Sequence, residues 1–159
     1  MAGRWFEEWR VGERIAHEIR RTVTETDNLL FSTLTHNSQP LHIDLEAAKA
    51  SEFGRILVNG TFTFALMIGL TVADTTVGTL LANLGYEQVV MPKPVFIGDT
   101  IRADTEVMNL RESRSRPNAG IVTFRHRAIN QREEVVCECL RSALIRRRPA
   151  DVSPATPAG

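Results

Sequence analysis

The sequence is poor in cysteine and lysine and carries no surplus of charge. Its 159 residues include two cysteines, and only Lys49 and Lys93 among the 19 basic residues are lysine. Cys137 and Cys139 lie two apart in a strand-like run, so they point to the same face and are poorly placed to bond to each other. With no disulfide framework and no signal peptide, a cytoplasmic location is expected. The 19 acidic residues balance the 19 basic ones, so no overall field favours nucleic acid or a membrane surface.

Long hydrophobic runs are also scarce. The longest uncharged run, residues 56–73, reaches spanning length but contains polar residues such as Asn59, Thr61 and Thr63. Such a run is too polar for a helix exposed to lipid, and it favours a helix inside a protein. From Thr61 to about Ala73 the residues are apolar on nearly every side, which predicts a central helix that other elements must cover.

Shorter helices are predicted before this central helix. Thr24, with Asp27 three residues later, predicts the start of a helix that ends near Thr35. Asp44 predicts the cap of a short helix over residues 45–51. The first of these helices has an apolar stripe made of Leu29, Leu30, Phe31 and Leu34.

Alternating apolar and polar residues predict a sheet, and the expected fold class is α+β. The strand-like runs are residues 13–24, 78–95, 99–110, 119–131 and 133–148. A single domain over residues 1–148, with one curved antiparallel sheet wrapped around the central helix, buries the apolar faces most economically. Because one wrapped sheet leaves an edge strand open, a homodimer or a higher homo-oligomer is expected. Residues 149–159 are rich in proline and alanine and predict a disordered C-terminal tail.

The segment "THNSQPLHID", residues 35–44, is the first candidate for chemistry. His42 can act as a general acid or base near neutral pH, or it can satisfy backbone groups of a loop, and the spacing leaves both open. Asn37 and Gln39 can orient a water or a carbonyl but cannot take a proton, and both are also common loop formers. Gly60 begins the central helix, where backbone N–H groups can bind an oxyanion, or it marks a simple helix boundary.

These residues carry a family resemblance. The run "LTHNSQPLHIDLEAAKASEFGRILVNG", followed by the central helix and by "PVFIGDTIRADTEV", resembles the MaoC-like hydratases of the hotdog fold. In that family the loop usually reads S-G-D-x-N-P-x-H-x-D and leads to H-G at the start of the central helix. The resemblance covers about residues 5–148. His42, Pro40 and Gly60 fall on the family's histidine, proline and helix glycine, whereas Asn37 replaces its aspartate, Gln39 its asparagine and Asn59 its second histidine.

The resemblance implies reversible addition of water to a 2-enoyl-CoA thioester, without a cofactor other than the coenzyme A of the substrate. In the family, the aspartate and histidine act on one water while backbone N–H groups of the central helix polarise the thioester carbonyl. Here the loss of the aspartate leaves two interpretations open. In the first, His42 moves the proton and Asn37 holds the water; in the second, the domain binds acyl thioesters without efficient turnover, or works with a partner subunit.

An acidic substrate gives the asparagine a physical reason. Beside the free carboxylate of mesaconyl-CoA or itaconyl-CoA an aspartate would be repelled, whereas the neutral amide of Asn37 can donate a hydrogen bond. Arg55 or Arg114 is expected to clamp that carboxylate. The other residues predicted to bind substrate are Gln39, Asn59 and Thr61.

A thioesterase is the rival enzyme class, because fold alone does not fix function. It would be expected to use a carboxylate on the central helix, and the only acid there, Asp74, stands at the far end from Gly60. That geometry favours hydration. No metal site is expected, since the candidate ligands are not clustered at a usual spacing.

Overall fold

A computed structural model describes residues 3–149. The predicted tail, residues 149–159, lies outside the described residues except for Pro149. After a 3-10 turn, η1 (Phe6–Glu8), the elements in chain order are β1 (Arg14–Thr22), α1 (Glu25–Leu34), α2 (Pro40–Ile43), α3 (Leu45–Ala50), α4 (Gly60–Thr75), β2 (Leu80–Val90), β3 (Thr100–Glu112), β4 (Ala119–Ile129) and β5 (Val135–Arg146).

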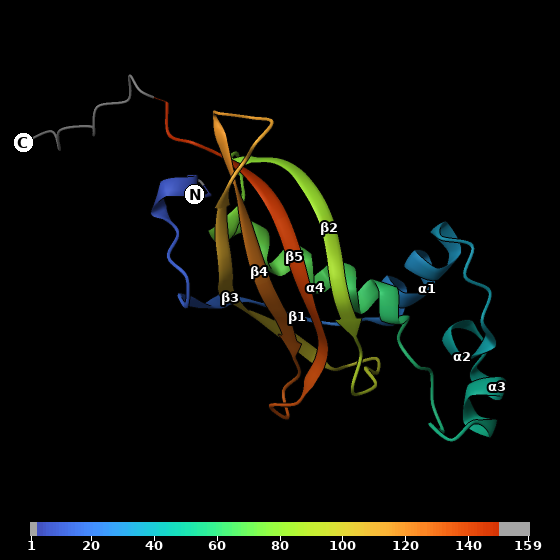
Figure 1. The fold of residues 1–159 in the computed structure, drawn as a ribbon. Helices are drawn as coiled ribbons and strands as arrows, with labels where there is room; N and C mark the ends of the chain where they lie inside the picture. The colour runs from blue at the N-terminus through green and yellow to red at the C-terminus, as the bar shows by residue number, and fades with distance from the viewer. Residues whose placement is uncertain (1–2, 150–159) are drawn as a thin grey trace, which may run out of the picture.

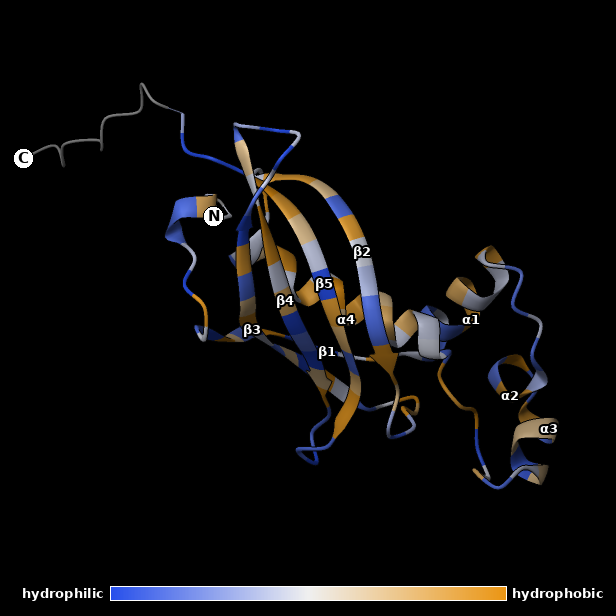
Figure 2. Cartoon of the chain, in the orientation of Figure 1, coloured by the Kyte–Doolittle hydropathy of each residue, from blue (hydrophilic) through white to orange (hydrophobic). Residues whose placement is uncertain are grey.

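One antiparallel sheet wraps α4, as predicted. The strand order is β1-β3-β4-β5-β2, and α4 packs against β1, β3, β4 and β5 (Figure 1). Along β3 the buried side chains of Ile101, Ala103, Thr105 and Val107 alternate with half-buried polar ones, and Figure 2 shows the same alternation on the neighbouring strands. The α+β architecture is therefore confirmed.

The caps of the short helices also form where the sequence places them. Thr24 and Asp27 make a reciprocal capping box at the start of α1, whose C-cap is Thr35. The Asp44 side chain accepts the backbone N–H groups of Glu46 and Ala47 at the start of α3. The expected loop around His42 is partly helical, because Pro40, with its preset φ, starts the single turn α2.

Two apolar surfaces lack full cover within the single chain. In the stripe of α1, Leu29, Leu30 and Leu34 are 50%, 56% and 71% exposed, and only Phe31 packs inward, against Phe62. Nor is α4 covered on every side: Thr61, Ala65 and Gly69 are exposed. The sheet of one chain covers only one side of α4, and α1 meets the helix only near its beginning.

A polar layer divides the core beneath α4. On each of β3, β4 and β5 one buried polar residue, Thr105, His126 or Arg141, stands between two apolar clusters. His17 connects this layer to the helix, since its Nδ1 lies 2.7 Å from the carboxylate of Asp74 and its Nε2 lies 2.7 Å from the Thr105 hydroxyl. The same hydroxyl lies 2.8 Å from Nδ1 of His126. Hydrogen bonds thus run across three strands at mid-core.

Candidate active site

The tautomer of His42 is set by its backbone neighbour. Nδ1 of His42 lies 2.8 Å from the carbonyl oxygen of Leu57. A carbonyl only accepts, so Nδ1 carries the hydrogen and Nε2 of the neutral ring keeps its lone pair. The imidazole is half-buried, and α2 holds it in place. His42 can therefore accept a proton at Nε2 while Leu57 fixes the orientation of the ring.

A buried asparagine joins this turn to the central helix. The side chain of Asn28, on α1, donates from Nδ2 to the carbonyl of His42 at 2.8 Å and accepts the N–H of Asn59 at 2.8 Å. Asn28 is fully buried, so both bonds are shielded from water. The sequence analysis missed this residue. The only sequence feature that points to it is a polar side chain next to the apolar residues of a predicted helix.

The structure gives Asn59 a different role from the predicted one. Its Oδ1 accepts the N–H of Thr61 at 3.0 Å and the Thr61 hydroxyl at 2.6 Å, and its Nδ2 donates to the Ser32 hydroxyl at 3.2 Å. Asn59 is 1% exposed and is the N-cap of α4. The structure therefore assigns the Oδ1 of Asn59 to the helix cap, and the prediction that Asn59 binds substrate stays a prediction.

The same cap removes the Thr61 N–H as an oxyanion donor, because Asn59 takes it. The N–H of Gly60, by contrast, has no acceptor among the described residues. A methyl group on Gly60 would stand 2.5 Å from Sδ of Met91, so glycine lets Met91 pack directly against the helix end. Of the Gly60 and Thr61 N–H groups, only that of Gly60 stays available to a ligand.

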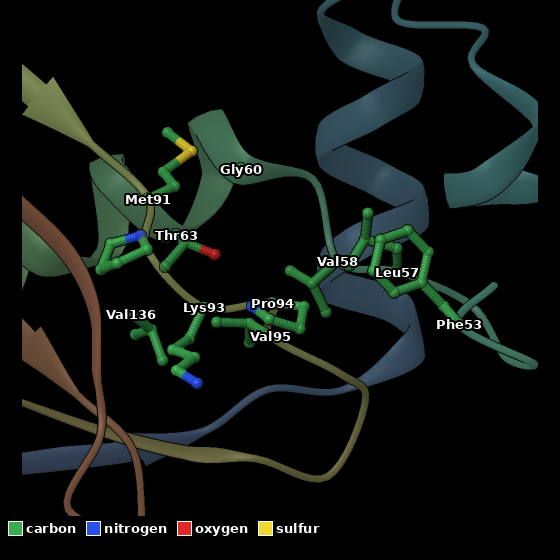
Figure 3. Close-up of a pocket in the computed structure, with 11 residues that line it drawn as sticks. Phe53, Leu57, Val58, Gly60, Thr63, Met91, Lys93, Pro94, Val95 and Val136 are labelled. Carbon is green, nitrogen blue, oxygen red and sulfur yellow. The ribbon is translucent and has the colours of Figure 1, made fainter.

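An apolar cavity opens at this end of α4. Its volume is about 360 Å³. Figure 3 shows the residues that line it. Leu57 and Gly60 line it, so it adjoins the residue that orients His42 and the open N–H of the helix. The other lining residues are Phe53, Val58, Thr63, Met91, Pro92, Lys93, Pro94, Val95 and Val136. A small acyl group fits such a cavity, with one polar end at the helix N-terminus.

Asn37 and Gln39 shape the turn before α2. Oδ1 of Asn37 accepts the Gln39 N–H at 3.1 Å, the hydrogen bond of an Asx turn. Nδ2 of Asn37 donates to no atom among residues 3–149, so this end of the amide can serve a ligand. Gln39 is exposed and is the N-cap of α2.

The two candidate arginines lie apart from the cavity lining. The guanidinium of Arg55 stacks on Phe96, with its carbon 3.7 Å from the ring centroid. Arg114 lies in the hairpin between β3 and β4, which Figure 1 places far from α1, α2 and α3. Neither Arg55 nor Arg114 is among the residues that line the cavity. That Arg55 or Arg114 clamps a substrate carboxylate stays a prediction.

The remaining ionisable groups show no metal cluster. Within residues 3–149, no three His, Cys, Asp or Glu side chains lie close enough together to hold an ion. The expectation that the protein needs no metal or other cofactor remains a prediction. No helix in this part of the chain has the length and apolar character needed to cross a membrane.

The fold and site define a hotdog domain with a histidine turn beside the start of its central helix. A Mycobacterium tuberculosis protein with a double hotdog fold matches with a TM-score of 0.84 at 22% identity, over 96% of this chain and 47% of that one. The model of the MaoC-like domain matches residues 7–128, and the chain belongs to that family.

One relative of known name and one solved structure resemble the chain over most of its length. The chain is 38% identical over 147 residues to a mesaconyl-CoA hydratase of Cereibacter sphaeroides. The matched region is 92% of this chain and 42% of that hydratase. This chain therefore spans less than half the length of that hydratase. The MaoC-like dehydratase from Rhodospirillum rubrum has a TM-score of 0.81 at 32% identity, over 92% of this chain and 99% of that one.

Proposed function

We propose that the protein is a hydro-lyase that adds water reversibly across the double bond of a 2-enoyl-CoA thioester. The observation that carries this proposal is the His42–Leu57 hydrogen bond, which leaves Nε2 of His42 free to accept a proton. His42 does not itself line the apolar cavity, but Leu57 does, together with Gly60 at the start of α4. Membership of the MaoC-like family and the names of the relatives support the proposal.

In the proposed hydration, the thioester oxygen accepts the N–H of Gly60 at the positive end of α4 as enolate charge develops. Nε2 of His42 removes a proton from water while the water oxygen bonds to C3. As this bond forms, the C2–C3 double bond becomes the C1–C2 double bond of the thioester enolate. The imidazolium then gives its proton to C2, and the thioester carbonyl re-forms. One water is consumed, and the Asn37 amide holds it before attack.

We further propose a short, branched dicarboxylic substrate of the mesaconyl-CoA or itaconyl-CoA type. The name of the Cereibacter relative supports this class, and so does the neutral amide at position 37 where the family pattern has a carboxylate. Coenzyme A enters as part of the substrate. The expected cytoplasmic location stays a prediction.

A homodimer is the proposed assembly. β2 is an edge strand of the sheet, and Leu84, Val89, Val90 and Met91 on or next to it are exposed. The uncovered side of α4 is a second surface that a partner could bury. The double hotdog match adds support, because one chain of that protein contains two such folds.

The test is to incubate the purified protein with crotonyl-CoA, mesaconyl-CoA and itaconyl-CoA while following ultraviolet absorbance and released thiol. We expect water addition, and in His42→Gln its loss by a factor of about 100 or more. Burial raises the pKa of Cys137 to about 12 and that of Cys139 to about 11, so protein thiols add little background. Thiol release would instead make the protein a thioesterase, and saturable binding without reaction would make it a binding module.

A further inference from the structure

The cavity beside Gly60 has a single charged group in its wall. Lys93 is the only ionisable residue among those that line it, and most of the others are apolar. Lys93 lies in the segment Met91-Pro92-Lys93-Pro94 that follows β2. The two prolines restrict the backbone dihedral angles on both sides of Lys93, and this limits the positions that its Cβ atom can take. Figure 3 shows this segment on one side of the cavity, with Phe53 and Leu57 on the other.

Lys93 has no ion-pair partner among the described residues. Glu134 is an acidic residue close enough for the charge of Lys93 to affect its pKa. Hydrogen bonds from Asn130 and Arg132 lower the pKa of Glu134 most, and the charge of Lys93 has the smallest effect. Arg132 lies 3.0 Å from this carboxylate. Glu134 is therefore already paired, and the ammonium group of Lys93 remains available to an anion.

A carboxylate entering an apolar cavity loses its hydration, so it needs an opposite charge there. The two arginines expected to supply that charge do not line the cavity: Arg55 stacks on Phe96, and Arg114 lies in the hairpin between β3 and β4. Lys93 lines the same cavity as Gly60, and its flexible four-carbon stem lets the ammonium group adjust to a short acyl chain.

We propose that Lys93 binds the free carboxylate of the acyl group and makes the enzyme select acidic enoyl thioesters over neutral ones. This inference rests on the proposed hydratase function and adds the residue that chooses the substrate. The thioester oxygen lies at Gly60, the reacting double bond faces His42, and the distal carboxylate meets Lys93. Selection then depends on charge at one position of the cavity wall, and the apolar remainder accepts the branching methyl group.

The experiment compares Lys93→Met with the unmodified enzyme on mesaconyl-CoA, itaconyl-CoA and crotonyl-CoA. We expect kcat/KM for the better dicarboxylic substrate to fall about 10- to 100-fold, the usual worth of a hydrogen bond to a charged group, while that for crotonyl-CoA changes less than about threefold. Lys93→Arg should restore part of the selectivity. Lys49→Met is the matched control, since Lys49 is the only other lysine and pairs with Glu46 on the exposed face of α3.

An equal loss on all three substrates would overturn the proposal, because Lys93 would then bind the coenzyme A phosphates that they share. Unchanged kinetics in Lys93→Met would overturn it as well, while active hydration by the unmodified enzyme would leave the proposed function standing. If the unmodified enzyme hydrates none of the three, the proposed function itself fails. Circular dichroism and melting curves of each variant exclude unfolding as the cause.

Discussion

The cap of α4 allows a sharp test, because the structure and the family pattern give Asn59 different roles. Replacing Asn59 by alanine removes an N-cap acceptor and two further side-chain hydrogen bonds, one from the Thr61 hydroxyl and one to Ser32. Asn59 is buried, so the loss at Ser32 cannot be repaired easily by water. The expected result is a loss of stability with only an indirect effect on substrate affinity.

The size of this loss follows from the bonds removed. Loss of an N-cap side chain costs about 0.5–2 kcal/mol, and each further hydrogen bond adds about 0.5–1.5 kcal/mol. Thr61 is exposed, so its hydroxyl can turn to water, and the cap and the Ser32 hydrogen bond together give about 1–3.5 kcal/mol. For a chain of this size that corresponds to a fall in melting temperature of roughly 2–14 °C.

Urea unfolding followed by circular dichroism, at a fixed protein concentration, measures this free energy. Asn118→Ala is the matched control, because Asn118 is exposed and forms only a backbone hydrogen bond, to the N–H of Arg147. The control should change stability by less than about 0.5 kcal/mol. If Asn59→Ala unfolds like the unmodified protein but raises KM strongly, then Asn59 contacts substrate and the reasoning from the cap is refuted.

Four further outcomes are expected. Gly60→Ala should change stability by less than about 1 kcal/mol, since only the flexible end of Met91 must move, yet displacing Met91 into the cavity should lower kcat/KM in the absorbance assay. Asn37→Asp should improve crotonyl-CoA hydration relative to mesaconyl-CoA hydration, because the added charge repels a substrate carboxylate; the opposite ratio would refute this role. Arg114→Gln should affect dicarboxylic and neutral substrates equally, and a selective loss would place Arg114 in the site of a partner chain. Burial lowers the pKa of His126 to about 3, so between pH 6.5 and 3 the unfolded chain binds a proton that the folded chain does not. The free energy of unfolding should therefore decrease as the pH is lowered from 6.5 to 3, and it should decrease less steeply in His126→Gln.

Local signals in the sequence were enough to predict most elements of the fold, although the segment that forms α2 was expected to be a loop. The capping box of Thr24 and Asp27, the cap at Asp44 and the period of two along β3 each depend on residues close in the chain, and all three are present. The wrapped sheet followed from the need to cover an apolar central helix. The exposed stripe of α1 could not be predicted, because apolar spacing does not tell whether the same chain or another surface provides the cover.

The candidate site was predicted less completely. His42 and Gly60 do lie at one end of α4, as the resemblance implied, but Asn59 is occupied by the helix cap. The role of Asn28 depends on atoms 14 and 31 residues away along the chain, which no local pattern encodes. Lys93 was likewise hidden, since a single lysine in an exposed segment becomes informative only when the cavity around it is known.

The order of strands in the sheet has a consequence for the growing polypeptide. β1 pairs only with β3, and Arg14 meets Glu106 across that pair, 92 residues later in the chain. At a synthesis rate of about 5–20 residues per second, β1 waits roughly 5–20 seconds for its partner, and α4 emerges before any strand that follows it. During that interval the apolar residues of α4 lack the strands β3, β4 and β5 against which they pack. A chaperone that binds nascent chains would therefore be expected to recognise residues 60–75, and the need for it should end when β3, β4 and β5 have emerged.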